Sequence, residues 1–454
     1  MRALLLVFVI AALTAACGRI GFGREAAVDG SVGAGADAGT DARADSTVDA
    51  APDGAMPDAT MDAAADAAAD AAAEAGGATD AGIVITPDGG APSPTMRAVA
   101  AGDGHSCAIT PTAGVMCWGK NSSGQLGDGT RTPSLVPVPV TGLAGPVVAL
   151  AAGGSSADGI ASTCAVTETG GAQCWGANSL GQLGDGTTTD RLVPVDVIGL
   201  GSGVVAISND DDHACAVTSL GDVFCWGNNN NSQLGDGTTT QRNSPVRVVG
   251  LAAAVDVAAG DDHSCALTAT RSVFCWGGNT QGQIGDGTTT TRPSPTEVLP
   301  NAVALALGDS HSCAVTSDGA VWCWGRNGNG ECGDGTTTER HSPVGVVGLR
   351  TTVTRVDLAD EFTCAVLSDL TAQCWGRNTS GELGDATTTS RAMPVDVMGL
   401  IDVGSISAAT GSVGHACAAT GTMTIRCWGA NGDGELGDGT TTTRLAPVDV
   451  VGFP

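Results

Sequence analysis

Cysteine is the residue whose type and spacing point most directly to chemistry in this 454-residue chain, which contains 16 cysteines. In an antiparallel hairpin that turns at residues 111–114, Cys107 and Cys117 lie opposite each other on one face. Outside the cytoplasm such a pair forms a disulfide. Reduced core thiols and metal ligands are the alternatives, although this spacing suits neither a zinc knuckle nor an iron–sulfur site. The same spacing recurs seven times, in Cys107 and Cys117, Cys164 and Cys174, Cys215 and Cys225, Cys265 and Cys275, Cys313 and Cys323, Cys364 and Cys374, and Cys417 and Cys427.

Other residues with catalytic or metal-binding potential also recur at fixed positions. Cys332 replaces a leucine or isoleucine of the other repeats, which predicts a buried, inert thiol rather than a reactive nucleophile. Five histidines precede the first cysteine of a pair by two positions, and their repetition favours one structural hydrogen bond per repeat over catalysis: His105, His213, His263, His311 and His415. Aspartates in Asp-Gly turns, such as Asp286, predict ordinary turns, with calcium ligands as the alternative. We therefore expect no catalytic residue, no metal site and no cofactor.

The elements that position these residues form a repeat of about fifty residues. Each copy contains an apolar run, a Gly-Asp turn, a His-Ser-Cys-Ala segment, a second turn and Cys-Trp-Gly, and it ends with a Gly-Gln-Leu-Gly-Asp-Gly loop and a Pro-Val segment. This pattern predicts four short strands per repeat, without a helical period. A single unit of this kind cannot bury its own faces, so the units must pack against their neighbours.

The repeat resembles that of the regulator of chromosome condensation family. The resemblance is carried by "CWGANSLGQLGDGT" at 174–187 and "GDSHSCAVTSDG" at 308–319, and it extends over residues 97–454. It implies an all-β fold, a closed seven-bladed β-propeller. The best-known role in the family is nucleotide exchange on a small GTPase beside chromatin. The resemblance also extends to secreted bacterial propellers that bind and inhibit proteins, and these match an exported chain better.

The residues before the repeats predict export and anchoring. Residues 1–16 contain an arginine and a short apolar run that ends in small residues before Cys17, which is typical of a bacterial lipoprotein signal peptide. An ordinary cleaved signal is the alternative. Gly18 after Cys17 favours sorting to the outer membrane. The pattern is compatible with an anchor on either the periplasmic or the surface side of that membrane. Residues 17–96 consist mainly of Ala, Asp, Gly and Pro and predict a disordered tether.

The charge of the chain restricts its partners. The formal net charge is −28, and Lys120 is the single lysine. A surface of this sign repels phosphate backbones, so we expect no nucleic-acid partner. The sequence predicts a monomer that acts as a protein- or ligand-binding module at the cell envelope, held to the membrane by its lipid and bound to an unidentified protein partner. An enzyme acting on cell-surface polymer and a structural envelope protein are the alternatives.

Three irregular repeats predict where that partner binds. The loop before the first cysteine is lengthened in repeats two and seven and altered in repeat six, and a closed ring brings blades six, seven, one and two together. Loops on a rigid scaffold carry binding residues, although neutral drift near the closure point is the alternative. Phe362 and Ile160 are the expected apolar anchors. The candidate binding residues are Gly154, Asp158, Ile160, Asp360, Glu361, Phe362, Thr410 and Val413.

Overall fold

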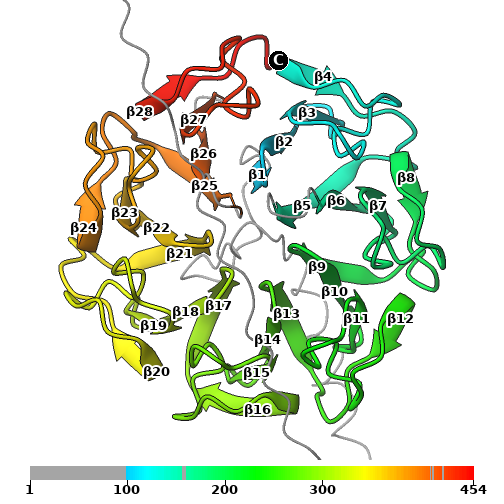
Figure 1. Cartoon of the computed structure of the whole chain (residues 1–454), viewed down its shortest axis with the longest axis horizontal. Coiled ribbons are helices and arrows are strands. Elements are labelled where there is room, and N and C mark those ends of the chain that lie inside the picture. The colour runs from blue at the N-terminus through cyan, green and yellow to red at the C-terminus, as the bar shows by residue number, and fades with distance from the viewer. Residues whose placement is uncertain (1–98, 156–159, 410, 412–413, 422–423) are drawn as a thin grey trace, which may run out of the picture. The chain divides into compact units, whose positions relative to one another are not determined.

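Seven four-stranded antiparallel sheets form the blades of a β-propeller around a central axis (Figure 1). The computed structural model describes residues 99–155, 160–409, 411, 414–421 and 424–454. The predicted all-β, seven-bladed fold is confirmed. Within these ranges no helix has the length and apolarity that crossing a bilayer requires. The predicted signal peptide, Cys17 and tether lie outside the described residues.

Each blade is one continuous segment whose strands run in chain order from the axis to the rim. Blades one and two contain β1 (Val99–Gly102), β2 (His105–Ile109), β3 (Val115–Gly119), β4 (Ser134–Pro139), β5 (Val147–Ser155), β6 (Ile160–Thr167), β7 (Ala172–Gly176) and β8 (Arg191–Asp196). Blades three and four contain β9 (Val204–Asn209), β10 (His213–Thr218), β11 (Val223–Gly227), β12 (Arg242–Arg247), β13 (Ala254–Ala259), β14 (His263–Thr268), β15 (Val273–Gly277) and β16 (Arg292–Leu299). Blade five contains β17 (Ala302–Leu307), β18 (His311–Thr316), β19 (Val321–Gly325) and β20 (Arg340–Gly345). Blades six and seven contain β21 (Val353–Leu358), β22 (Phe362–Leu367), β23 (Ala372–Gly376), β24 (Arg391–Asp396), β25 (Val403–Ala408), β26 (His415–Thr420), β27 (Ile425–Gly429) and β28 (Arg444–Asp449).

Burial falls from the axis to the rim. All residues of β14 are buried, whereas the outermost strand β16 of the same blade has only half-buried and exposed residues. The middle strands are buried on both faces because both faces pack against neighbouring blades. The outer strands have one solvated side and contain more polar residues and proline, as edge strands do.

The hydrophobic core consists of seven clusters, each at the interface between two blades. One cluster joins the cysteine pair and Leu126 of blade one to Leu150 and Trp175 of blade two. The predicted register is confirmed, since Cys107 pairs with Cys117 across β2 and β3. All seven predicted cysteine pairs have their sulfurs at bonding distance, and the disulfides lie inside these clusters.

The ring closes between blades seven and one through the contacts that join the other blades. The Trp118 indole of blade one donates a hydrogen bond of 2.8 Å to the carbonyl of Glu435 in blade seven, just as Trp175 of blade two donates to the carbonyl of Gln125 in blade one. The Ala101 backbone N–H donates to the Ser407 hydroxyl across the same closure. Closure therefore depends on packing and hydrogen bonds between two complete sheets.

Candidate functional site

The five repeated histidines form hydrogen bonds between blades, as predicted. His263 Nε2 in blade four lies 2.8 Å from the Ser312 hydroxyl in blade five, and that hydroxyl donates to the carbonyl of Gln283. A hydroxyl has one hydrogen, so Ser312 must accept from His263, which places the proton on Nε2. Equivalent bonds join His105 to Thr163, His213 to Ser264, His311 to Thr363 and His415 to Ser106.

Burial keeps four of these histidines neutral, namely His105, His263, His311 and His415. It lowers the pKa of His105 to about 4 and the pKa values of His263, His311 and His415 to about 3. All five side chains are fully enclosed, with 0 % exposure. A catalytic base needs access to substrate and a pKa near the working pH, so this arrangement supports a structural role.

Phe362 was predicted to be an exposed apolar anchor, and this prediction is wrong. Its residue exposure is 2 %, and its ring packs in the core between blades six and seven, where it occupies the repeat position of the histidines. Gly414 in blade seven lies directly against it, since a Cβ on Gly414 would come within 2.7 Å of the ring. Blade seven has Ala416 at the position where the partner hydroxyl stands in blade five, so the aromatic side chain replaces the hydrogen bond with packing.

The other predicted binding residues have mixed outcomes. Gly154 is a buried residue of the lengthened hairpin β5–β6, paired with Ala161, so it offers no side chain to a partner. Ile160 is half-buried at the end of the same hairpin. Asp360 and Glu361 are partly exposed in the β21–β22 loop. Asp158, Thr410 and Val413 lie outside the described residues.

Cys332 and the Asp-Gly turns have the structural roles that were predicted. Burial raises the pKa of the Cys332 thiol, which lies in the core between blades five and six. In the turn at Asp286 the carboxylate accepts hydrogen bonds from Thr288, Asn279 and Arg292. Burial alone would raise the pKa of Asp286, but these bonds lower it. Among the described residues no group of three or more His, Cys, Asp or Glu is arranged to hold a metal ion.

A dense group of carboxylates lies on the face formed by the loops between the first and second strands of the blades. Five aspartates share one repeat position, two residues before the histidine position, and four further acidic residues flank them. We call this group the acidic mouth; it consists of Asp103, Asp210, Asp211, Asp212, Asp261, Asp262, Asp309, Asp360 and Glu361. Sequence analysis named Asp360 and Glu361 but missed the other seven members, although the repeated Gly-Asp turn was the available signal.

The carboxylates of the acidic mouth raise one another's pKa. Burial raises the pKa of Asp261 to about 9, with contributions from Asp262, Asp309 and Asp210 and from a hydrogen bond that protonated Asp261 donates to the Asp309 side chain. Burial raises the pKa of Asp360 to about 7, and neighbouring Asp309 adds to the shift. The pKa of Asp211 is raised by burial and by carboxylates from three other blades, including Asp360. The five loops thus converge on one electrostatic site.

Few cations balance this charge. Lys120 Nζ lies 3.1 Å from the Asp103 carboxylate. Glu361 binds two arginines, Arg326 and Arg377, with the Arg377 contact at 2.7 Å. Within the described ranges, the carboxylates of Asp211, Asp261, Asp309 and Asp360 have no lysine or arginine at ion-pair distance.

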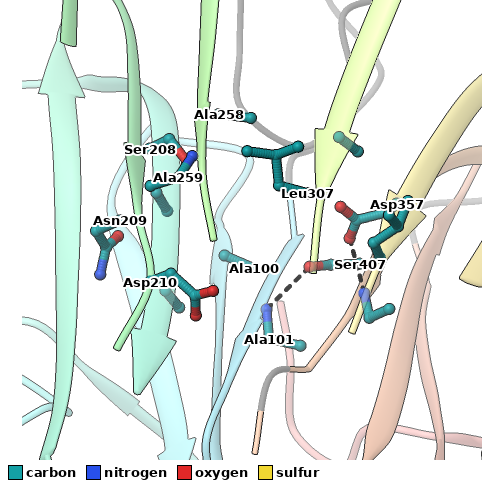
Figure 2. A pocket seen from close by; sticks show the side chains of 15 residues that line it. Ala100, Ala101, Ser208, Asn209, Asp210, Ala258, Ala259, Leu307, Asp357 and Ser407 are labelled. Carbon is teal, nitrogen blue, oxygen red and sulfur yellow. Dashed lines mark hydrogen bonds between the residues drawn. The ribbon is translucent and has the colours of Figure 1, made fainter. Parts of the chain in front are cut away.

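A cavity of about 60 Å³ lies on the axis, at the ends of the inner strands that lead into the acidic mouth (Figure 2). All seven inner strands contribute to its wall, mostly through alanine. Its polar lining comes from Ser208, Asn209, Asp210, Asp357 and Ser407. The cavity wall therefore combines alanine methyl groups with polar side chains, including carboxylates on blades three and six.

With the blade geometry established, the family can be assigned. A family model for the RCC1-like domain matches residues 155–453. The chain belongs to the RCC1-like domain family. Two matches to the regulator of chromosome condensation (RCC1) repeat, at residues 96–125 and 114–157, extend this assignment over blade one.

Curated relatives of this RCC1-like propeller match it over about a third of its length. Probable E3 ubiquitin-protein ligase HERC6 of Homo sapiens is 38% identical over 170 residues, which is 35% of this chain and 16% of HERC6. Ultraviolet-B receptor UVR8 of Arabidopsis thaliana is 33% identical over 158 residues, 35% of each chain. The propeller therefore spans well under two thirds of these relatives.

Solved structures agree with the RCC1-like fold. Yeast RCC1 (Prp20), solved with Kap60 bound, has a TM-score of 0.64 at 21% identity, over 74% of this chain and 83% of that one. Human WBSCR16 has a TM-score of 0.63 at 23% identity, over 74% of this chain and 92% of that one. At these identities the likeness shows the fold alone.

Proposed function

We propose that this RCC1-like propeller is a protein-binding module of a bacterial cell envelope and that it binds its partner through the acidic mouth. The lipoprotein signal before Cys17 and the tether at 17–96 support a location at the outer membrane. The propeller then stands away from the lipid surface, where a partner can approach its open face.

The observation that carries this proposal is the crowding of carboxylates at the acidic mouth. Partly buried carboxyl groups of like charge destabilise the free protein when they ionise, as the raised pKa values of Asp261 and Asp360 show. A cationic surface placed over the acidic mouth offsets the repulsion between the carboxylates, and this makes the free energy of association more favourable. Disulfides and interblade hydrogen bonds fix the second strands, which adjoin these loops, and this lowers the entropic cost of binding.

Binding rather than catalysis is also the role that the related structures favour. Yeast RCC1 (Prp20) was solved with Kap60 bound to it, and Prp20p of Saccharomyces cerevisiae is described with binding properties toward Gsp1p and histones. The HERC relatives are named as ubiquitin ligases, but this chain covers 16% of HERC6. We therefore propose a protein partner and do not transfer the ligase activity.

Capture from envelope extracts tests the proposal. The full chain in neutral detergent is immobilised beside two matched variants, each lacking two carboxylates. Asp211→Asn with Asp261→Asn alters the acidic mouth, whereas Asp318→Asn with Asp369→Asn replaces the same number of carboxyl groups in turns on the opposite face. We expect the acidic-mouth variant to lose specific partners at least tenfold and the control variant to retain them. Equal recovery by both variants would refute binding through the acidic mouth.

A further inference from the structure

The axial cavity beneath the acidic mouth is small and is lined in part by alanine. Its volume of about 60 Å³ holds roughly four to six water-sized groups. Ala100, Ala151, Ala258 and Ala306 occupy one register position, opposite the first cysteine of each pair, and they form much of the apolar wall. Small side chains at this position keep the axis open, and their methyl groups favour methylenes over a strongly hydrated ligand.

A buried polar atom in the same cavity lacks a partner. Asn209 is 6 % exposed, and its amide nitrogen donates to the carbonyl and the hydroxyl of Ser162. Its Oδ1 has no hydrogen-bond partner among the described residues. Figure 2 shows this amide at the cavity wall beside Asp210. A buried acceptor of this kind costs free energy until a donor reaches it.

Two carboxyl groups face the cavity from opposite sides of the ring. Asp210 extends from the end of β9 in blade three, and Asp357 lies on β21 in blade six. Asp357 Oδ2 accepts the Ala408 N–H at 2.7 Å, which fixes its orientation (Figure 2). The cavity therefore offers acceptors to a ligand that carries a cationic donor at its end.

The chain itself shows which cation this face accepts. Its single lysine, Lys120, extends from the end of β3 to Asp103 of the acidic mouth. The remaining central carboxylates, Asp211, Asp261 and Asp309, have no such partner among the described residues.

We propose that the acidic mouth and the axial cavity form a binding site for a primary alkylammonium group, supplied by a lysine side chain of the partner protein. That a partner protein supplies the ammonium rests on the proposed function above, whereas the existence of the ammonium site does not depend on it. A lysine side chain has four methylenes, which can contact the alanine methyl groups, and a compact ammonium with three donors, which the acceptors of the cavity require. The arginine guanidinium is planar and larger than an ammonium, so it fits a cavity of about 60 Å³ less well.

Titration calorimetry on the full chain in neutral detergent tests the site with defined probes. These are 1,5-diaminopentane, Nα-acetyl-lysine methylamide, the same compound acetylated on Nε, the arginine analogue and Ca²⁺. We expect the first two to bind and the Nε-acetylated compound to bind at least tenfold more weakly. Binding at pH 7 should release protons to the buffer, because an ammonium lowers the pKa of Asp261 and Asp360. The other charged groups facing these two carboxyls are Asp103, Asp210, Asp211, Asp262, Asp309, Glu361 and Arg326.

Matched variants locate the bound group. Asp211→Asn should weaken the binding of the lysine probe at least fivefold, whereas Asp318→Asn on the opposite face should leave it unchanged. Asn209→Leu removes the unpartnered oxygen without changing the charge and should weaken binding as well, with thermal unfolding recorded to confirm that each variant is folded. No binding of either amine, equal binding of the acetylated probe, or binding of Ca²⁺ alone would overturn the proposal.

Acetylation of the envelope extract distinguishes the two sources of ammonium. If the partner supplies a lysine, extracts treated with acetic anhydride should lose capture by the wild-type chain. If diaminopentane binds but acetylated extracts still yield the partner, a free linear amine is the ligand and the lysine assignment fails. If the probes bind and no partner is captured from untreated extract, the proposed protein-binding function fails while the site remains.

Discussion

At the scale of single residues, the histidine and its partner hydroxyl change together around the ring. Five blades have a histidine whose Nε2 donates to Ser or Thr in the next blade. Blades two and six have Ser162 and Phe362 in place of the histidine, and the blades after them have Ala214 and Ala416 in place of the hydroxyl. If the histidine were lost alone, the buried hydroxyl of the next blade would lack its hydrogen-bond donor, and this costs free energy. The residue types at the two positions are therefore coupled.

This coupling predicts the outcome of a double-mutant cycle on His263 and Ser312. Ser312→Ala leaves the buried His263 N–H without an acceptor and should lower the free energy of unfolding by about 1–3 kcal/mol. His263→Ala should cost at least as much, since it also opens a cavity. Urea denaturation of both single variants and the double variant measures the coupling. We expect the double variant to lose less than the sum, and strict additivity would contradict the proposed bond.

At the scale of elements, each blade is cross-linked between its second and third strands. The hairpin β14–β15 illustrates the arrangement, since Cys265 and Cys275 are paired across it and both are fully buried. The alanine-rich inner strands give each blade a small core, so a covalent bond between strands adds stability that packing alone supplies only weakly. The disulfide acts chiefly by restricting the unfolded chain.

Removing one disulfide should therefore lower stability without changing the fold. We expect Cys265→Ala with Cys275→Ala to reduce the free energy of unfolding by about 3 kcal/mol, as loop closure of this length predicts. The urea midpoint measures the change, and Cys332→Leu is the control because it replaces a buried thiol by the residue of the other repeats. Thiol titration of the native, unreduced propeller should find Cys332 protected. Ready alkylation of the paired cysteines would show that they are not bonded.

At the scale of the whole molecule, electrostatics links stability to pH. Asp261 titrates with a pKa of about 9, and burial raises the pKa values of Asp357, Asp360 and Glu435 to about 7. In the unfolded chain these groups ionise near pH 4. Between those limits the folded state binds more protons than the unfolded state, so stability falls as pH rises. The neutral histidines act in the opposite sense, but only below about pH 6.5, where the unfolded chain protonates them.

Thermal unfolding between pH 6.5 and 9 isolates the carboxyl contribution. We expect the melting temperature to fall steadily over this range and to fall less in Asp261→Asn, which cannot ionise. Added salt should raise the melting temperature most at the alkaline end, because it screens the partly exposed carboxylates. A melting temperature that is constant or rises with pH would contradict the electrostatic account of the acidic mouth.

The anchoring of the molecule gives a further prediction. Cys17→Ser removes the thiol that a lipoprotein signal requires, so the protein should leave the membrane fraction and lose the mass of its lipid. Fractionation and intact mass measurement of wild type and variant check this. Unchanged membrane association of the variant would show that the signal was misinterpreted.

The sequence by itself determined the repeat, the blade number, the cysteine pairing and the structural role of the histidines. These features depend on local spacing, since a hairpin places Cys107 opposite Cys117 whatever surrounds it, and a fixed period requires equivalent environments in successive copies. The burial of Cys332 followed in the same way from the leucine that it replaces.

Only the tertiary structure decided which side chains face solvent and which converge. Phe362 lies in an irregular loop by sequence but points into the next blade, because the histidine position is an interface between sheets. The aspartates of the acidic mouth are about fifty residues apart along the chain, and they become one site because closure of the ring brings five loops to a single axis. Convergence of that kind depends on the angle between successive blades, which no local pattern encodes.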